Sequence, residues 1–161
     1  MIKVGEKLPN AELGSMTDGG PVVVFLAQKL VGRKVAIFGF PGAFTPTCSG
    51  AHMPTVVRTK MEYDAKGVDE IICLAVNDVH VMRAWGESTG ATKAGITLLA
   101  DMDGTYTKAI GMSFDAPTVG FLGRSQRYSM YVEDGVVRYF NVEESRSTCT
   151  LSGGDNLLSQ I

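Results

Sequence analysis

The stretch FGFPGAFTPTCS, residues 38–49, joins an apolar segment to the start of a helix through a turn rich in glycine and proline. Thr45 is a good N-cap residue and Pro46 suits the first position of a helix, so Cys48 is expected in the first helical turn. Backbone N–H groups are unpaired there, and the positive end of the helix dipole favours a thiolate over a thiol. The stretch therefore predicts a reactive Cys48, although an isolated cysteine is more often a small buried hydrophobic residue.

Strands and helices alternate on both sides of this stretch. An Asp-Gly pair at 134–135 predicts a tight hairpin turn, whereas segment 11–30 is ambiguous because turn residues stand beside a run of valines. The alternation predicts a single α/β domain over residues 1–161, with a central mixed β-sheet flanked by helices. The expected strands are 34–40, 70–76, 97–100, 127–132 and 136–142, and the expected helices are 48–66, 78–85, 104–111 and a last one at Leu157 and Leu158.

The helix that contains Cys48 is expected to be amphipathic and kinked. Gly67 is suited to end it, and Pro54 predicts a kink roughly one turn after Cys48. A first segment that is kinked in this way can unwind without disrupting the rest of the helix. Apolar residues at three- and four-residue spacing predict the face that packs on the core: Met53, Val56, Val57 and Met61.

Composition and charge argue against several classes of function. The chain has 161 residues, of which 45% are hydrophobic and 20% charged, as expected for one globular domain. A formal net charge of −2 with no long basic block argues against nucleic-acid binding. No stretch approaches the roughly 18 apolar residues of a membrane span, and the N-terminus lacks the apolar core of a signal peptide. We therefore expect a cytoplasmic protein, with an organelle left open because a transit peptide can be removed.

The three cysteines, Cys48, Cys73 and Cys149, are an odd number and do not form a secreted disulfide framework. They fit a reducing compartment with at least one working thiol. No CxxC pair occurs, and only two histidines, His52 and His80, are available, so no metal site is expected.

The string PGAFTPTC, residues 41–48, resembles the active-site motif of the peroxiredoxins, in the form found in the type-5 branch with its atypical two-cysteine and plant type-2-like members. The resemblance covers essentially the whole chain. It implies a thioredoxin-like fold, a homodimer, and reduction of hydrogen peroxide and alkyl hydroperoxides without a cofactor. The other matching segments are 39–40, 52–54, 75–78, 99–101 and 124–130.

The resemblance also implies a role for each matching residue. Cys48 is the peroxidatic nucleophile, Thr45 a hydroxyl partner of the peroxide and the thiolate, Pro41 a shield for the pocket, and Arg127 the matching cation. Attack on an O–O bond spreads negative charge over sulfur and both oxygens, so fixed donors stabilise the transition state more than the ground state. Arginine stays charged and offers a planar fork of donors, which lysine does not.

Cys48 becomes a sulfenic acid in this chemistry, and a second thiol must reduce it. Cys149 matches the resolving cysteine of animal type-5 enzymes, and Cys73 matches the second cysteine of plant type-2 relatives. Cys73 lies in an apolar run typical of a strand covered on both faces, whereas Cys149 lies among turn-forming residues that can move, so we favour Cys149. The alternative is that Cys149 is an ordinary thiol and that glutathione or a glutaredoxin, rather than thioredoxin, reduces Cys48 directly.

Other assignments stay open at this point. His52, four residues after Cys48, is either a base for the thiol or a structural residue, and we favour the latter. Arg124 either orients the site through a carboxylate or is solvated. The rival functions are a thioredoxin-type disulfide reductase, which the absence of CxxC disfavours, and a redox sensor or holdase that signals through oxidised Cys48.

Overall fold

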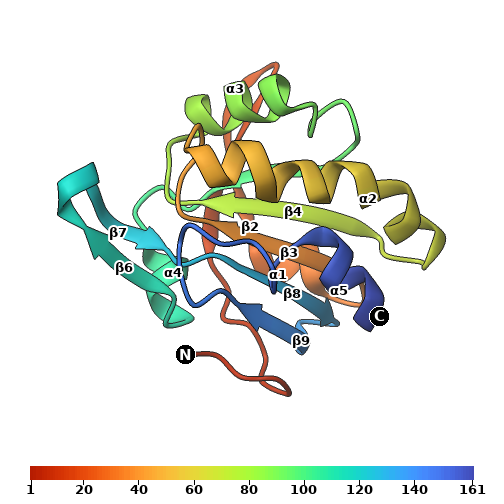
Figure 1. Cartoon of the computed structure of the whole chain (residues 1–161). Coiled ribbons are helices and arrows are strands. Elements are labelled where there is room, and N and C mark those ends of the chain that lie inside the picture. Colours follow the sequence, from red (N-terminus) through yellow and green to blue (C-terminus); the bar gives the residue numbers. More distant parts are fainter.

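A mixed sheet of seven strands forms the centre of the computed structural model, which describes residues 1–161 (Figure 1). The strand order is β2-β1-β5-β4-β3-β8-β9. Strands β3, β4 and β5 are parallel and every other neighbouring pair is antiparallel. The strands are β1 (Glu12–Thr17), β2 (Gly20–Phe25), β3 (Lys34–Phe40), β4 (Glu70–Ala75), β5 (Thr97–Ala100), β8 (Tyr128–Glu133) and β9 (Val136–Val142).

Helices cover both faces of the sheet and bury two separate cores. Helices α2 (Met53–Ala65), α3 (Val79–Thr89) and α5 (Gly154–Gln160) pack on one face, as Figure 1 shows, and α1 (Leu26–Leu30) and α4 (Thr105–Ala109) on the other. None of these helices has the length and apolar character that crossing a membrane requires.

Strand β3 carries both cores because its side chains alternate between the two faces. Phe38 and Phe40 belong to the core under α2 and α3, and Ile37 belongs to the core under α1 and α4. Between them, a side chain at Gly39 is excluded, because its Cβ would lie 2.1 Å from the Tyr128 ring. The strand that leads into the Cys48 turn is therefore fixed from both sides.

Most of the elements predicted from the sequence are confirmed. Strands β3, β5 and β9 have the predicted bounds, and β4, β8, α3, α4 and α5 differ from their predictions only at the ends. The Asp-Gly turn is confirmed by the positive φ of Asp134 and Gly135. The ambiguous segment 11–30 forms the β1–β2 hairpin and helix α1.

A second, two-stranded sheet was not predicted. Strands β6 (Ser113–Ala116) and β7 (Phe121–Ser125) form a hairpin joined by the 3₁₀ turn η2 (Pro117–Val119), and this hairpin projects from the body of the molecule (Figure 1). Its strands are short and only partly buried. Runs of four and five residues are too short for an alternation of apolar and polar residues to identify a strand.

The helix after Cys48 departs from its prediction in two ways. Cys48–His52 (η1) form a π-helical turn, in which the Met53 N–H donates to the carbonyl of Cys48, before α2 begins. Pro54 stands at the start of α2, where it has no N–H to give to an α-helical bond, and the wider π turn comes directly before this position. Met61 was wrongly assigned to the core face, because it is 82% exposed. The buried face of α2 consists of Met53, Val56, Thr59 and Tyr63.

Candidate active site

The loop between β3 and the Cys48 turn is held in a strained conformation. Phe44 has a φ of 61°, in the left-handed region, which costs a residue with a side chain about 1–2 kcal/mol. Two hydrogen bonds stabilise the loop: the Thr45 hydroxyl donates to the Gly42 carbonyl at 2.7 Å, and the Ala43 N–H donates to Asn77 Oδ1 at 3.0 Å. The Thr45 side chain thus binds back into the loop, instead of accepting from a helix N–H as an N-cap does. Helical structure nevertheless begins after Thr45, as predicted.

Cys48 is fully buried as the first residue of the π turn. Arg127, from the connection between β7 and β8, donates from Nη2 to Cys48 Sγ at 3.3 Å. The side chain of Arg127 is also buried, at 2% exposure, so its positive charge is poorly screened by water. The guanidinium therefore places a positive charge directly against the sulfur of Cys48.

Two further contacts fix the Arg127 guanidinium. Nη1 donates to His52 Nδ1 at 3.0 Å, and Nη2 also donates to the Arg146 carbonyl at 2.8 Å. His52 Nε2 in turn donates to the Ser152 carbonyl at 2.9 Å. Burial, with the charge of Arg127 as a second cause, lowers the pKa of His52 to about 3. The imidazole is therefore neutral with both nitrogens engaged, and it orients Arg127 instead of deprotonating Cys48.

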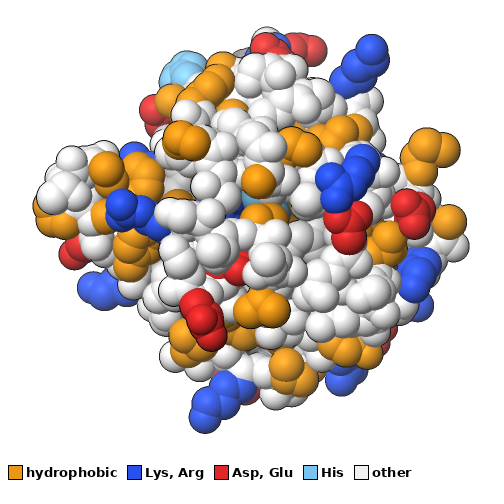
Figure 2. Space-filling view, viewed as in Figure 1, with side chains coloured by type: hydrophobic (Ala, Val, Ile, Leu, Met, Phe, Trp, Pro, Cys, Tyr) orange, Lys and Arg blue, Asp and Glu red, His pale blue; other side chains and the backbone are white.

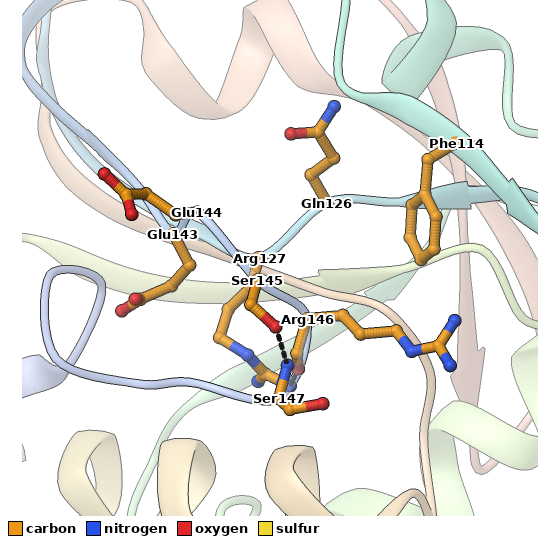
Figure 3. Close-up of a pocket in the computed structure, with 8 residues that line it drawn as sticks. All are labelled: Phe114, Gln126, Arg127, Glu143, Glu144, Ser145, Arg146 and Ser147. Carbon is orange, nitrogen blue, oxygen red and sulfur yellow. Dashed lines mark hydrogen bonds between the residues drawn. The ribbon is translucent and has the colours of Figure 1, made fainter.

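Two cavities meet at Arg127. One, of about 380 Å³, is lined by Pro41, Thr45 and Arg127 together with apolar side chains that include Phe44 and Phe121. The other, of about 450 Å³ and drawn in Figure 3, is lined by Arg127 and the segment 143–147. The structure thus brings Pro41, Thr45 and Arg127 together on one cavity, beside the buried sulfur of Cys48.

Arg124 holds the outer wall of this cavity. Its Nη1 donates to the Pro41 carbonyl at 3.3 Å, and its guanidinium carbon lies 4.9 Å from the centre of the Phe121 ring. The carboxylate alternative is wrong, because Arg124 contacts a carbonyl, and the solvated alternative holds only in part, because the side chain is half-buried. It fastens the Pro41 loop to the β6–β7 hairpin.

The other two cysteines lie in different surroundings. Cys73 is fully buried in β4, with its Sγ 4.0 Å from Met53 Sδ, and burial raises the pKa of its thiol. Cys149 lies in the irregular segment between β9 and α5 and is only half-buried. Burial also raises the pKa of Cys149 above its usual value. Cys73 is thus enclosed by the sheet and its helices, whereas Cys149 lies on a segment outside both.

Residues that the sequence did not identify complete the site. Asn77 holds the Cys48 loop through Ala43, and the carbonyls of Arg146 and Ser152 fix Arg127 and His52. Backbone carbonyls carry no side-chain signal, so no residue pattern points to them. Asn77 follows the apolar run of β4, where polar residues at the carboxyl end of a parallel strand are a usable signal.

Comparisons with known proteins agree with this geometry. A family model described as Redoxin matches residues 3–158. The chain is 43% identical over 160 residues to the chloroplastic peroxiredoxin-2E-2 of Oryza sativa subsp. japonica, covering 97% of this chain and 71% of that protein. It is 37% identical over 161 residues to peroxiredoxin-2B of Arabidopsis thaliana, covering 99% and 98%.

Solved structures match over the same length. The crystal structure of reduced Prx3 from Vibrio vulnificus in complex with H₂O₂ superposes with a TM-score of 0.92, at 43% identity and 99% coverage of both chains. Peroxiredoxin 5 from Alvinella pompejana gives a TM-score of 0.83 at 30% identity, covering 99% of this chain and 97% of that one. The thioredoxin-like fold is thereby confirmed, and the chain belongs to the peroxiredoxin family of thiol-dependent peroxidases.

Proposed function

We propose that Cys48 is the peroxidatic cysteine and that Pro41, Thr45 and Arg127 form the site in which it attacks hydrogen peroxide and alkyl hydroperoxides. The observation that carries this proposal is the 3.3 Å contact from Arg127 Nη2 to Cys48 Sγ beside a cavity lined by Pro41 and Thr45. Apolar side chains on the same cavity suit the alkyl group of an organic hydroperoxide.

The thiolate of Cys48 attacks the terminal oxygen of the peroxide, an S–O bond forms and the O–O bond breaks. The leaving oxygen takes a proton and departs as water or an alcohol, and Cys48 is oxidised to a sulfenic acid. Arg127 donates to the oxygens on which negative charge develops. The Thr45 hydroxyl, which donates to Gly42, keeps lone pairs free to accept from the peroxide O–H.

Cys149 is the proposed resolving cysteine. Its thiol attacks the sulfur of the sulfenic acid, an S–S bond forms, and the hydroxyl leaves as water, after which thioredoxin reduces the disulfide. Support comes from its place in the irregular segment before α5, whose backbone also contacts Arg127 and His52. The glutathione or glutaredoxin route remains the second outcome that the next experiment distinguishes.

Mass spectrometry of the protein after one equivalent of peroxide tests these roles. The wild type is expected to lose two hydrogens through a Cys48–Cys149 disulfide, whereas Cys149→Ser is expected to gain one oxygen on Cys48. Turnover of Cys149→Ser with thioredoxin as the only reductant should fall at least about tenfold, since no disulfide forms for it to reduce. Cys73→Ala is the matched control and should behave as the wild type. A wild-type protein that stays unbridged and turns over with glutathione would contradict the assignment of Cys149.

We also propose that the chain forms a homodimer through an apolar rim beside the site. Phe44, Val119 and Leu122 are exposed there, with Leu122 at 68%, and Figure 2 shows hydrophobic side chains on the projecting β6–β7 hairpin. Such exposed apolar clusters are typical of protein interfaces. Leu122→Asp should convert the dimer to a monomer in sedimentation velocity, whereas Val22→Asp, at the distant β2 edge, should not. A wild-type protein that sediments as a monomer would refute the proposal.

The expected cytoplasmic location stays a prediction. The relatives include proteins named as chloroplastic in Oryza sativa and Arabidopsis thaliana, and one named as mitochondrial in Arabidopsis thaliana. An organelle is therefore the alternative setting, and each of these compartments is compatible with free thiols.

A further inference from the structure

A carboxylate outside the peroxide cavity fastens the segment that carries Cys149. Glu143, directly after β9, is buried at 6% exposure. Its Oε1 accepts from the N–H groups of Leu151 and Ser152, both at 2.7 Å, and from the Ser152 hydroxyl at 2.9 Å. Its Oε2 accepts from the hydroxyls of Thr148 at 3.0 Å and Thr150 at 3.4 Å.

No cation pairs with this carboxylate, so hydrogen bonds alone stabilise its charge. Burial by itself would raise the pKa of Glu143, but the hydrogen bonds from Ser152, Thr148 and Leu151 outweigh burial and hold the pKa below its usual range. In Figure 3 the carboxylate of Glu143 is turned away from Arg127, so it does not compete with Cys48 for the guanidinium. Its contacts instead draw the chain from Thr148 to Ser152 into one compact bend.

That bend leads by two routes to the reactive sulfur. The first route begins at Ser152, whose N–H donates to Glu143 and whose carbonyl accepts from His52. His52 in turn accepts from Arg127, and Arg127 donates to Cys48 Sγ. Each link is a hydrogen bond between neighbouring groups, with 3.3 Å as the longest of these distances.

On the second route, Thr148 is held by Glu143 Oε2, and the nearby Arg146 carbonyl accepts from Arg127 Nη2. The Glu143 backbone is also tied to the site, because its N–H donates to the Arg127 carbonyl at 3.0 Å. Glu143 therefore binds the Arg127 backbone directly and, through Thr148 and Ser152, the segment whose carbonyls contact Arg127 and His52.

We propose that Glu143 is a positioning residue of the peroxidase site, which acts through the 146–152 segment to hold the Arg127 guanidinium on Cys48. The proposal rests on the roles proposed above for Cys48 and Arg127, and it does not depend on whether Cys149 resolves the sulfenic acid. Without the carboxylate, the Arg146 and Ser152 carbonyls lose their fixed places, and Arg127 loses two of the restraints that aim it.

Stopped-flow measurement of the oxidation step gives a direct test. Trp85, the only tryptophan, donates from Nε1 to Ser49 Oγ at 3.0 Å and so reports on the turn that begins at Cys48. Glu143→Ala should lower the second-order rate constant for oxidation by hydrogen peroxide by about 10- to 100-fold, the loss that misplacement of a catalytic group produces. Glu143→Gln keeps an acceptor oxygen for Leu151 and Ser152 and should recover most of the rate.

The exposed Glu12→Gln, on β1 and outside both cavities, is the matched control and should retain the wild-type rate constant. A fluorescence-independent assay, the loss of free thiol on Cys48 with time, guards against an altered Trp85 signal. Thermal unfolding of each variant confirms that rates are compared between folded proteins. If the alanine variant does not fold, Glu143→Asp replaces it, because its shorter side chain withdraws the carboxylate from Leu151 and Ser152 and should also lower the rate constant.

A double-mutant cycle separates positioning from general stabilisation. In an Arg127→Gln background, Glu143→Gln and Glu143→Ala should change the rate constant less than about twofold, because the guanidinium that Glu143 positions is already absent. Equal fold-losses in both backgrounds, or a wild-type rate in folded Glu143→Ala, would overturn the role of Glu143. If Arg127→Gln itself left the rate unchanged, the assignment of Arg127 would fail as well, so the two failures can be told apart.

Discussion

Replacing Cys48 with serine is expected to reduce peroxide consumption to the rate of the buffer alone. A serine hydroxyl remains protonated at neutral pH beside Arg127, and it lacks the intrinsic nucleophilicity of a thiolate toward oxygen. Neither of the other cysteines can substitute for it. Cys73 is enclosed in β4, and neither Cys73 nor Cys149 has a hydrogen bond from Arg127. The measurement is hydrogen peroxide consumption with dithiothreitol as reductant, which does not depend on the natural thiol partner.

The same variant should keep its fold. Serine is close to cysteine in size, and Arg127 Nη2, which now donates to Cys48 Sγ, can donate to the new hydroxyl. Circular dichroism and the melting temperature should therefore stay near those of the wild type. Full turnover by folded Cys48→Ser would mean that another cysteine supplies the reactive thiol. A wild-type protein that is oxidised once but does not turn over would favour the redox-sensor function.

The fold was largely predictable because its central strands and its surface helices show different periodicities. The apolar runs of β3 and β4 correspond to strands with both faces buried, and the spacing of Met53 and Val56 corresponds to the buried side of α2. The prediction that Met61 faces the core failed because an apolar residue at the right spacing is not excluded from the surface. Tyr63 instead reaches the core, and its hydroxyl donates to the Gly154 carbonyl. The β6–β7 hairpin was not predicted because its short strands bury little surface.

The site was predictable only where side chains carry the chemistry. Residue type and the surrounding motif identify Cys48, Thr45 and Arg127 in the sequence. In the structure Arg127 contacts Cys48, and Thr45 lines the adjoining cavity. The π turn was not predictable in this way, because it depends on how the backbone accommodates a proline that cannot donate. Glu143 was also missed, since a carboxylate next to a second glutamate in a polar segment is typical of a solvated surface.

Arg127 links these parts, because one guanidinium contacts the sulfur of Cys48, the neutral His52 and the segment that carries Cys149. Under the proposed roles, movement of Cys48 or of the Arg146 backbone toward a Cys48–Cys149 disulfide would break a hydrogen bond of Arg127. The contacts that hold Arg127 on Cys48 would then oppose such a movement, and Arg127 would couple the two proposed steps.

Arg127→Gln should accordingly lower the second-order rate constant for Cys48 oxidation by about 10²–10³, the usual loss when one donor to a developing oxyanion is removed. Glutamine is polar and can keep one contact to the Arg146 carbonyl, but it supplies neither the positive charge beside the Cys48 sulfur nor the paired donors of a guanidinium. Arg127→Lys keeps the positive charge but lacks the paired donors of a guanidinium. Its rate constant should lie between those of Arg127→Gln and the wild type.

The rate constant is measured by stopped-flow oxidation with hydrogen peroxide, followed through Trp85. Arg138→Gln on β9 is the matched control, because Arg138 is exposed, pairs with Glu133 and makes no contact with Cys48. It should react as the wild type does. The lysine variant separates the two contributions of Arg127: a rate equal to that of arginine would mean that charge alone activates Cys48. A rate equal to that of glutamine would mean that the fixed geometry of two donors, held between Cys48 and His52, is what the oxidation step requires.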